Sequence, residues 1–317
     1  MKKILITRKL LLPSENYASK IFDAKLNKDD KLITIDQLIN ESSDCDGILS
    51  SLTEKIDSDV ISKLSGKIKI ISNFAVGFGN IDILAAKKRN IVVTNTPDVL
   101  TDATAEIAML ILLGATRRAK EGMEWASKKN WKWSADFLTG KQLTGARLGI
   151  LGMGRIGRAV ANIARSFGMI IHYHNRSQLD KNLEKGAIYH KSLESLLSVS
   201  DFFSINCPAT KETKHIINKK TLSYFPDGAV LSNSARGDMI EDSAMVEALK
   251  SGKIYSLGLD VYNGEPDIYK EYLTLPNVFV LPHLGSATVR TRTAMGNLAV
   301  SNLEEFFKTG KCQNTVN

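Results

Sequence analysis

A short apolar segment, a glycine-rich turn and a helical stretch follow one another in the middle of this chain. Residues 148–151 read LGIL, residues 152–157 read GMGRIG, and residues 158–167 have the apolar spacing of a helix. This order of strand, turn and helix belongs to sheets of parallel strands with helical crossovers. It therefore predicts an α/β fold.

The three glycines of the turn point to a dinucleotide. Gly152 permits the tight turn, Gly154 lets the backbone approach a pyrophosphate, and Gly157 lets helix and strand pack closely. The N-terminus of the helix that follows would offer free N–H groups to the phosphates, and Arg155 and Ile156 in the turn are further candidate cofactor-binding residues. A glycine turn alone is weak support, but its position between a strand and a helix favours a cofactor site.

The alternation of strand and helix continues to about residue 283. Strands are expected at residues 148–151, 170–173, 202–206, 229–232, 256–259 and 278–281. Six strands joined by helical crossovers indicate a doubly wound sheet.

A separate series of the same kind occupies residues 3 to 95. Its expected strands are residues 4–7, 47–50, 68–72 and 91–94, with a helix between Asp82 and Arg89. Pro97 interrupts the rhythm, because proline lacks a backbone donor and disfavours helix at the residue before it. One long apolar helix is expected from residue 101 to about 128, and a terminal helix after Ser286 could return to the first domain.

The sequence thus predicts two doubly wound, Rossmann-like parallel-sheet domains with an active-site cleft between them. Residues 1–99, completed by residues 285–317, would form the substrate-binding domain. Residues 100–284 would form the dinucleotide-binding domain. Ligands in such sheets bind beyond the carboxyl ends of the strands.

Composition narrows the class of protein. With 43% hydrophobic and 24% charged residues, the chain can bury a large core. The cysteines, Cys45, Cys207 and Cys312, lack the spacing of a disulfide framework or a zinc site, so a reducing cytoplasm and no metal are expected. The most apolar stretch, residues 107–115, is much shorter than the ~18 residues of a membrane span.

The net charge of +8 raises the question of nucleic acid. The 42 basic residues are scattered among 34 acidic ones, without a basic block that contains aromatic residues. A solvated, lysine-rich surface explains this pattern, so neither nucleic acid nor a membrane is expected as a partner.

The end of the strand at residues 170–173 should contact the adenosine ribose. NAD-selective sites usually place a carboxylate there, whereas this chain has Asn175, Arg176 and Ser177. Arg176 can pair with a 2′-phosphate through charge-assisted hydrogen bonds. The sequence therefore predicts NADPH, with NADH possible but less favoured.

Three later segments bring a cation, a carboxylate and an imidazole to strand ends. Arg236 follows the strand at 229–232, Glu265 follows the strand at 256–259, and His283 follows the strand at 278–281. An imidazole paired with a carboxylate can transfer a proton, and an arginine can hold a carboxylate and a carbonyl oxygen. These are the candidate catalytic residues.

Motifs along the whole chain resemble the D-isomer-specific 2-hydroxyacid dehydrogenases, and within them the glyoxylate/hydroxypyruvate reductases. The motifs are NFAVG at 73–77, PDVLT at 97–101, GMGRIG at 152–157, SARGD at 234–238, GLDV at 258–261, GEP at 264–266 and PHLGSAT at 282–288. One departure is Gly79, where many relatives carry aspartate.

The resemblance implies a reaction and a role for each residue. A hydride passes from the nicotinamide to a 2-keto carbon while His283, paired with Glu265, supplies a proton. Arg236 would hold the substrate carboxylate and carbonyl, together with the N–H groups of Val76 and Gly77. Further cofactor contacts implied by the resemblance are Cys207, Pro208, Thr213, Ser234, Ala235, Asp260 and Gly285.

The resemblance also implies a homodimer and additional substrate contacts. Trp133 has the placement of a tryptophan that enters the neighbouring subunit's pocket, and Leu52 and Ser286 would line the substrate site. Two alternatives remain at this point: a dehydrogenase for another 2-keto acid, such as phenylpyruvate or pyruvate, and a non-catalytic dinucleotide-sensing corepressor. Neither the physiological 2-keto acid nor the direction of reaction follows from the sequence.

Overall fold

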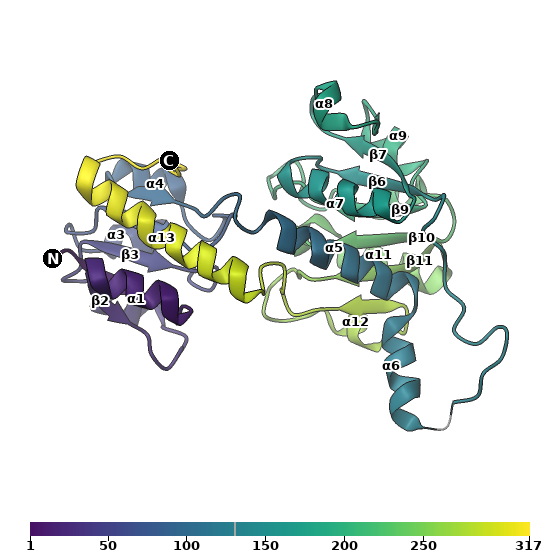
Figure 1. Ribbon diagram of the computed structural model, residues 1–317, viewed down its shortest axis with the longest axis horizontal. Helices are drawn as coiled ribbons and strands as arrows, with labels where there is room; N and C mark the ends of the chain where they lie inside the picture. The colour runs from purple at the N-terminus through teal and green to yellow at the C-terminus, as the bar shows by residue number, and fades with distance from the viewer. Residues whose placement is uncertain (130) are drawn as a thin grey trace. The chain divides into compact units, whose positions relative to one another are not determined.

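The computed structural model describes residues 1–129 and 131–317 (Figure 1). The chain divides into two compact units. The first unit comprises Met1–Leu100 and Ser286–Asn317, and the second comprises Thr101–Gly285. Each contains its own parallel sheet covered by helices, which confirms the predicted pair of α/β domains.

The first unit has a five-stranded parallel sheet with the order β2-β1-β3-β4-β5. Its strands are β1 (Lys3–Ile6), β2 (Asp23–Leu26), β3 (Gly47–Ser50), β4 (Ile70–Asn73) and β5 (Val92–Thr94). Four strands were expected in this sheet, which was wrong by one: the fifth strand, β2, was not predicted. Its sequence, DAKL, has two charged residues and lies at the sheet edge, where no apolar run is required.

Alternate residues of these strands face opposite layers of helices. Ile48 and Ile71 face the core beneath α2, α3 and α4, whereas Leu49 and Ile70 face α1 and α13. The helices are α1 (Leu12–Ile21), α2 (Ile35–Glu41), α3 (Ser58–Lys63), α4 (Ile83–Lys88) and α13 (Val289–Thr309). The C-terminal helix α13 therefore packs in the first unit, beside α1 (Figure 1).

The second unit has a seven-stranded parallel sheet with the order β12-β11-β10-β9-β6-β7-β8. Its strands are β6 (Arg147–Leu151), β7 (Ile170–His174), β8 (Ile188–Tyr189), β9 (Phe202–Ile205), β10 (Ala229–Asn233), β11 (Ile254–Leu259) and β12 (Val278–Val280). Strand β8 was not predicted, because this edge strand has only two residues and is too short to show a strand-like alternation of apolar and polar residues. The strand order reverses between β6 and β9, which is where doubly wound sheets bind ligands.

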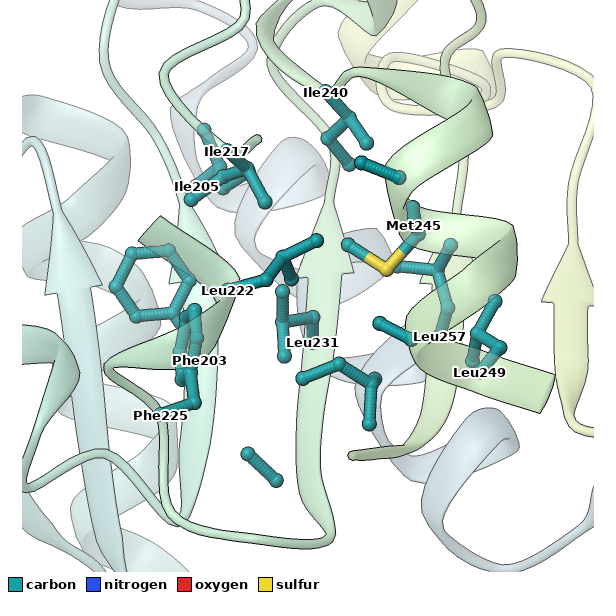
Figure 2. Close-up of a cluster of buried hydrophobic side chains, with 14 of the residues drawn as sticks. Phe203, Ile205, Ile217, Leu222, Phe225, Leu231, Ile240, Met245, Leu249 and Leu257 are labelled. Carbon is teal, nitrogen blue, oxygen red and sulfur yellow. The ribbon is translucent and has the colours of Figure 1, made fainter. Parts of the chain in front are cut away.

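Two hydrophobic layers cover this sheet. On one face, α7 (Arg155–Ser166) packs over β6 and β7, and α5 (Thr101–Thr116) packs beside it over β10 and β11. On the other face, Phe203, Leu231 and Leu257 pack beneath α9 (Leu193–Leu197), α10 (Lys219–Ser223) and α11 (Asp242–Ser251) (Figure 2). Shorter helical segments of this unit are α8 (Lys181–Glu184), the 3₁₀ turn η1 (Gly237–Met239) and α12 (Lys270–Thr274).

The single helix expected from residue 101 to about 128 is two helices. α5 ends at Thr116, and α6 (Ala119–Lys128) begins after Arg118, whose φ of +54° is left-handed and cannot continue an α-helix. The Arg118 guanidinium binds Glu121 in the first turn of α6. Within residues 1–129 and 131–317, none of the helices combines the length and the apolar character needed to cross a membrane.

Candidate active site

The glycine turn lies between β6 and α7, and two of its glycines are required by the backbone. Gly152 has a φ of +89°, and a Cβ there would lie 2.5 Å from the backbone N of Cys207. A Cβ on Gly157 would lie 2.3 Å from the carbonyl oxygen of Gly152. By contrast, a Cβ on Gly154 would meet nothing within 4 Å, so this glycine leaves open space beside the turn.

The start of α7 lies beside this open space. Gly154 is the N-cap of α7 and supplies no side-chain cap, and Arg155 and Ile156 form the first helical positions. The first N–H groups of a helix lack intrahelical partners and attract anions. Asn175 supports the turn from β7, because its Oδ1 accepts a 2.6 Å hydrogen bond from the N–H of Met153.

Arg176 and Ser177, the residues predicted to lie near an adenosine ribose, follow β7 and are exposed. A carboxylate, Glu212, lies within electrostatic reach of Arg176. A hydrogen bond from Thr210, its own backbone N–H and the charges of Lys211 and Arg176 lower the pKa of Glu212. Sequence reasoning missed Glu212, which comes from the loop after β9.

That loop carries three further predicted contact residues. Cys207 is half-buried with its Sγ 3.9 Å from the Sδ of Met239, and burial raises the pKa of its thiol to about 11. The Thr213 hydroxyl donates to the carbonyl oxygen of Pro208 at 2.9 Å and accepts from the N–H of Thr210 at 2.7 Å. Thr213 therefore fixes the shape of the loop next to the strand-order reversal.

Unpaired polar atoms gather at the carboxyl ends of three neighbouring strands. Asn206 follows β9, Ser234 follows β10 and Asp260 follows β11. Within the described part of the chain, Asn206 Oδ1, Ser234 Oγ and Asp260 Oδ2 are buried and have no hydrogen-bond partner. Because an unpaired buried polar atom is costly, such a row indicates groups that a ligand completes. Asn206 was not predicted, although its place after a strand was a usable signal.

His283 and Glu265 form a hydrogen-bonded pair. His283 Nδ1 lies 2.6 Å from Glu265 Oε2, and Glu265 Oε1 accepts a 2.8 Å bond from the N–H of Tyr262. Burial alone would raise the pKa of Glu265, but the hydrogen bond and charge of His283 outweigh it and hold that pKa below its ordinary value. Glu265 is therefore an ionised partner that leaves the Nε2 of His283 for another group.

The backbone around His283 is held in an uncommon conformation. His283 has a φ of +56°, a left-handed value that costs a non-glycine residue about 1 kcal/mol or more. The neighbours on both sides are anchored, since Tyr262 Oη donates to the Leu281 carbonyl at 2.6 Å and Leu284 N–H donates to Asp260 Oδ1 at 2.7 Å. These bonds fix the direction of the His283 ring.

Asp260 is almost fully buried, with 1% of its surface exposed. Burial raises the pKa of its carboxyl, against the hydrogen bond from Leu284 N–H. The nearby Gly285 carbonyl accepts from the Thr104 hydroxyl at 3.2 Å. Asp260 thus has one oxygen used in the protein and one free, as expected for a residue that binds a ligand amide.

Arg236 follows β10 and lies within electrostatic reach of Glu265. Burial lowers the pKa of its guanidinium, while the charges of Glu265 and Asp238 oppose that effect. Its Nη1 donates to the Ala235 carbonyl at 2.6 Å. Asn233 holds the turn, because its Oδ1 accepts from the N–H of Ala235 and its Nδ2 donates to the Arg236 carbonyl.

The predicted substrate residues of the first unit lie at the carboxyl edge of its sheet or at its C-terminal segment. Val76 and Gly77 follow β4, Leu52 follows β3 with 41% of its surface exposed, and Ser286 precedes α13. Asn95 and Asn73 donate to the carbonyl oxygens of Val76 and Gly77, respectively. Sequence reasoning missed both asparagines, since buried polar residues at strand ends carry no pattern of their own.

Trp133 lies in the second unit, beyond α6, and is 80% exposed. The structure does not bring it next to any other predicted site residue of that unit through a hydrogen bond or ring contact within the described residues. It does bring together Arg236, Glu265, His283 and Asp260 through the interactions given above.

These features fit a bound dinucleotide. Gly154 leaves room for phosphates beside the first turn of α7, and the unpaired oxygen of Asp260 could accept from a carboxamide. The reversal of strand order between β6 and β9 lies at the same edge.

Comparison with known proteins agrees with this reading. Residues 109–285 match the family model of the D-isomer specific 2-hydroxyacid dehydrogenase, NAD binding domain. The chain is 42% identical to a glycerate dehydrogenase from Hyphomicrobium methylovorum, covering 96% of both chains, and 39% identical to a glyoxylate reductase from Thermococcus litoralis, covering 99% of this chain and 96% of the relative.

Solved structures give the same result over the full length. An NADPH-dependent glyoxylate/hydroxypyruvate reductase from Sinorhizobium meliloti has a TM-score of 0.88 at 32% identity, covering 100% of this chain and 98% of the other. A glyoxylate reductase from Paecilomyes thermophila has a TM-score of 0.90 at 34% identity, with 99% and 98% covered. The chain belongs to the D-isomer-specific 2-hydroxyacid dehydrogenase family, the enzymes that its motifs resemble.

Proposed function

We propose that this protein reduces a small 2-keto acid, glyoxylate or hydroxypyruvate, to the 2-hydroxy acid with NADPH. The observation that carries the proposal is the 2.6 Å pair of His283 and Glu265 within electrostatic reach of Arg236. These three residues follow adjacent strands of the unit that fits a dinucleotide. Relatives named glyoxylate reductase and glycerate dehydrogenase support the same substrate class.

Residues of the second unit would hold the cofactor. The turn from Gly152 to Gly157 and the start of α7 bind the pyrophosphate, and Asp260 Oδ2 accepts from the nicotinamide carboxamide. When bound, the reduced nicotinamide supplies the hydride for the 2-keto carbon. Ser234, at the end of β10, has a second unpaired oxygen for the same ligand.

His283 serves as the proton donor in this proposal. Its Nδ1 is engaged by Glu265, so the proton on Nε2 moves to the carbonyl oxygen of the substrate as negative charge develops there. The C=O bond becomes C–OH, and the imidazolium becomes neutral imidazole. Glu265 stabilises the protonated ring before this transfer and keeps its tautomer and direction fixed.

Arg236 and the loop after β4 select the carboxylate. Arg236 carries a permanent positive charge and a planar set of donors that suits a carboxylate and an adjacent carbonyl oxygen. In the first unit, the N–H groups of Val76 and Gly77 are further donors that suit a carboxylate. Leu52 and Ser286 would contact the substituent on the 2-keto carbon, which is hydrogen in glyoxylate and a hydroxymethyl group in hydroxypyruvate.

The preference for NADPH rests on Arg176. It is exposed after β7, where its guanidinium can pair with a 2′-phosphate, and Asn175 and Ser177 add no repelling charge. A relative from Sinorhizobium meliloti whose name includes NADPH dependence was solved with NADP. We expect Arg176→Ala to lower kcat/KM for NADPH about tenfold or more and to change that for NADH little.

We further propose that the protein is a homodimer. Helix α6 has no buried residue, and Met123 and Trp133 are 70% and 80% exposed, which leaves an apolar surface for a second copy. In that assembly Trp133 contacts the substrate site of the partner. Light scattering on wild-type protein and Trp133→Ala tests both statements.

A rate assay tests the main proposal. Oxidation of NADPH and of NADH is followed with glyoxylate, hydroxypyruvate, pyruvate and phenylpyruvate. The proposal predicts the highest kcat/KM for glyoxylate or hydroxypyruvate with NADPH. Faster reduction of phenylpyruvate, or a clear preference for NADH, would contradict the substrate or the cofactor assignment, respectively.

A further inference from the structure

The loop after β4 presents three consecutive peptide groups whose carbonyl oxygens are all bound on the protein side. The carbonyl of Ala75 accepts from the N–H of Thr96 at 2.8 Å. The carbonyl of Val76 accepts from Asn95 Nδ2 at 2.8 Å, and that of Gly77 accepts from Asn73 Nδ2 at 3.0 Å. Asn73 and Asn95 are both buried.

Because each peptide group is planar, these bonds also fix the direction of the N–H groups on the opposite side of the loop. In a trans peptide the C=O and the N–H of the next residue point in opposite directions. The N–H groups of Val76, Gly77 and Phe78 are therefore directed away from Thr96, Asn95 and Asn73. Among the described residues, none of these three N–H groups donates to a protein acceptor.

Asn95 is itself held rigidly by the C-terminal segment. Its backbone N–H donates to the Asn314 carbonyl at 3.2 Å, and its carbonyl accepts from Asn302 Nδ2 at 2.9 Å. Asn302 is 1% exposed, and its Oδ1 accepts from Asn314 Nδ2 at 2.8 Å. The side-chain amide of Asn95 thus reaches Val76 from a fixed backbone.

We propose that Asn95, together with Asn73, is a positioning residue that directs three successive N–H groups, those of Val76, Gly77 and Phe78, toward the substrate carboxylate. This proposal rests on the proposed function and adds a third donor, Phe78, to the two expected from the sequence. Successive N–H groups on one side of a loop form a concave anion site without any side-chain charge. Asn95 contacts no substrate and acts through the Val76 carbonyl.

The test compares Asn95→Ala with a matched asparagine. Asn27 is in the same unit and donates to the carbonyl oxygens of Thr7 and Lys31, a comparable loop role away from β4. Oxalate is the probe, because its adjacent carboxylates mimic the carboxylate and carbonyl of a 2-keto acid. Its dissociation constant is measured by calorimetry, and the KM for glyoxylate by the rate assay.

We expect N95A to raise the oxalate dissociation constant and the glyoxylate KM roughly tenfold or more, with a smaller change in kcat and an unchanged dissociation constant for NADPH. N27A should leave all four values near wild type. Wild-type oxalate affinity and KM in N95A would overturn the proposal. If N95A does not fold, Asn95→Asp replaces it, since it keeps the shape but cannot donate to the Val76 carbonyl from an ionised carboxylate.

Hydrogen exchange on the wild-type protein supplies a second readout that requires no turnover. Oxalate should slow the exchange of the amides of residues 76–78, and this protection should be lost in N95A. Exchange at these amides that oxalate does not change would contradict the proposal. If the wild-type protein shows the protection but reduces none of the 2-keto acids tested, the anion site stands and the proposed reaction fails.

Discussion

Replacing Gly154 with alanine separates the stability of the glycine turn from its role in cofactor binding. Gly154 is the N-cap of α7 with φ of −76° and ψ of −152°, and an added Cβ meets nothing within 4 Å. Alanine is a poorer N-cap than glycine by about 1 kcal/mol. Alanine also restricts the unfolded chain more than glycine does, which stabilises the folded state by about 0.4–1 kcal/mol. The free energy of unfolding should therefore change by less than about 1 kcal/mol, which corresponds to a shift in Tm of at most roughly 2–4 °C.

Cofactor binding should change much more. The added methyl group fills the space beside the first N–H groups of α7, where the pyrophosphate would lie. Loss of one hydrogen bond to a charged group costs about 1.5–3 kcal/mol, which corresponds to roughly a 10- to 150-fold rise in the dissociation constant for NADPH. Fluorescence titration of NADPH and thermal unfolding measure the two effects on one sample.

Two other glycines provide the controls. Gly66 also has nothing within 4 Å of an added Cβ, and it lies in the first unit, so Gly66→Ala should bind NADPH as wild type does. Gly157→Ala would place a Cβ 2.3 Å from the Gly152 carbonyl oxygen, so it should lose stability, by about 1–3 kcal/mol or more. If Gly154→Ala binds NADPH with wild-type affinity, the turn does not contact the pyrophosphate and the cofactor assignment is wrong.

Three further substitutions each remove the charge of one carboxylate. Glu265 and Asp260 are described above, and the third, Asp201, binds the Arg147 guanidinium at 2.7 and 2.9 Å. Glu265→Gln removes the charge beside His283 and should lower kcat for reduction about tenfold or more, as initial rates will show; an unchanged kcat would refute the pairing. Asp260→Asn should weaken NADPH binding about tenfold in a titration, since the free acceptor is replaced by a donor. Because burial raises the pKa of Asp260, its stabilising contribution is lost as pH rises, and the variant should gain stability relative to wild type between acid and neutral pH. Asp201→Asn should lose about 0.5–1 kcal/mol at neutral pH in urea unfolding. The hydrogen bond from Arg147 lowers the pKa of Asp201, so this difference should shrink as pH falls through the lowered pKa.

The sequence predicted the parts of the fold that follow from apolar periodicity. Buried strands such as β3 and β10 have continuous apolar runs, and the glycine turn is marked by steric demands that only glycine meets. The edge strands β2 and β8 could not be predicted from apolar periodicity. An edge strand has a neighbouring strand on one side only, and its conformation is fixed by hydrogen bonds to that strand. The break after α5 depends on Arg118 adopting a left-handed conformation, which residue type does not signal.

In the candidate site, too, some residues could be predicted from the sequence and others could not. Arg236, Glu265 and His283 could be predicted as a group because charged residues at strand ends are spaced like those of a known family, and His283 and Glu265 are within hydrogen-bond distance. Asn175 was expected to contact a ribose, and the bond that its amide oxygen accepts from the N–H of Met153 could not be predicted from the sequence. Asn206 could not be identified as an unpaired group from sequence, since pairing depends on side-chain geometry.

The central claim is that His283 donates a proton during NADPH-dependent reduction of a small 2-keto acid. The most direct measurement is the initial rate of NADPH oxidation with saturating glyoxylate or hydroxypyruvate, for wild type and for His283→Gln, with cofactor affinity measured on both. We expect activity in the wild type, a loss of ~100-fold or more in kcat for the variant, and unchanged NADPH binding. Near-wild-type turnover by His283→Gln would contradict it.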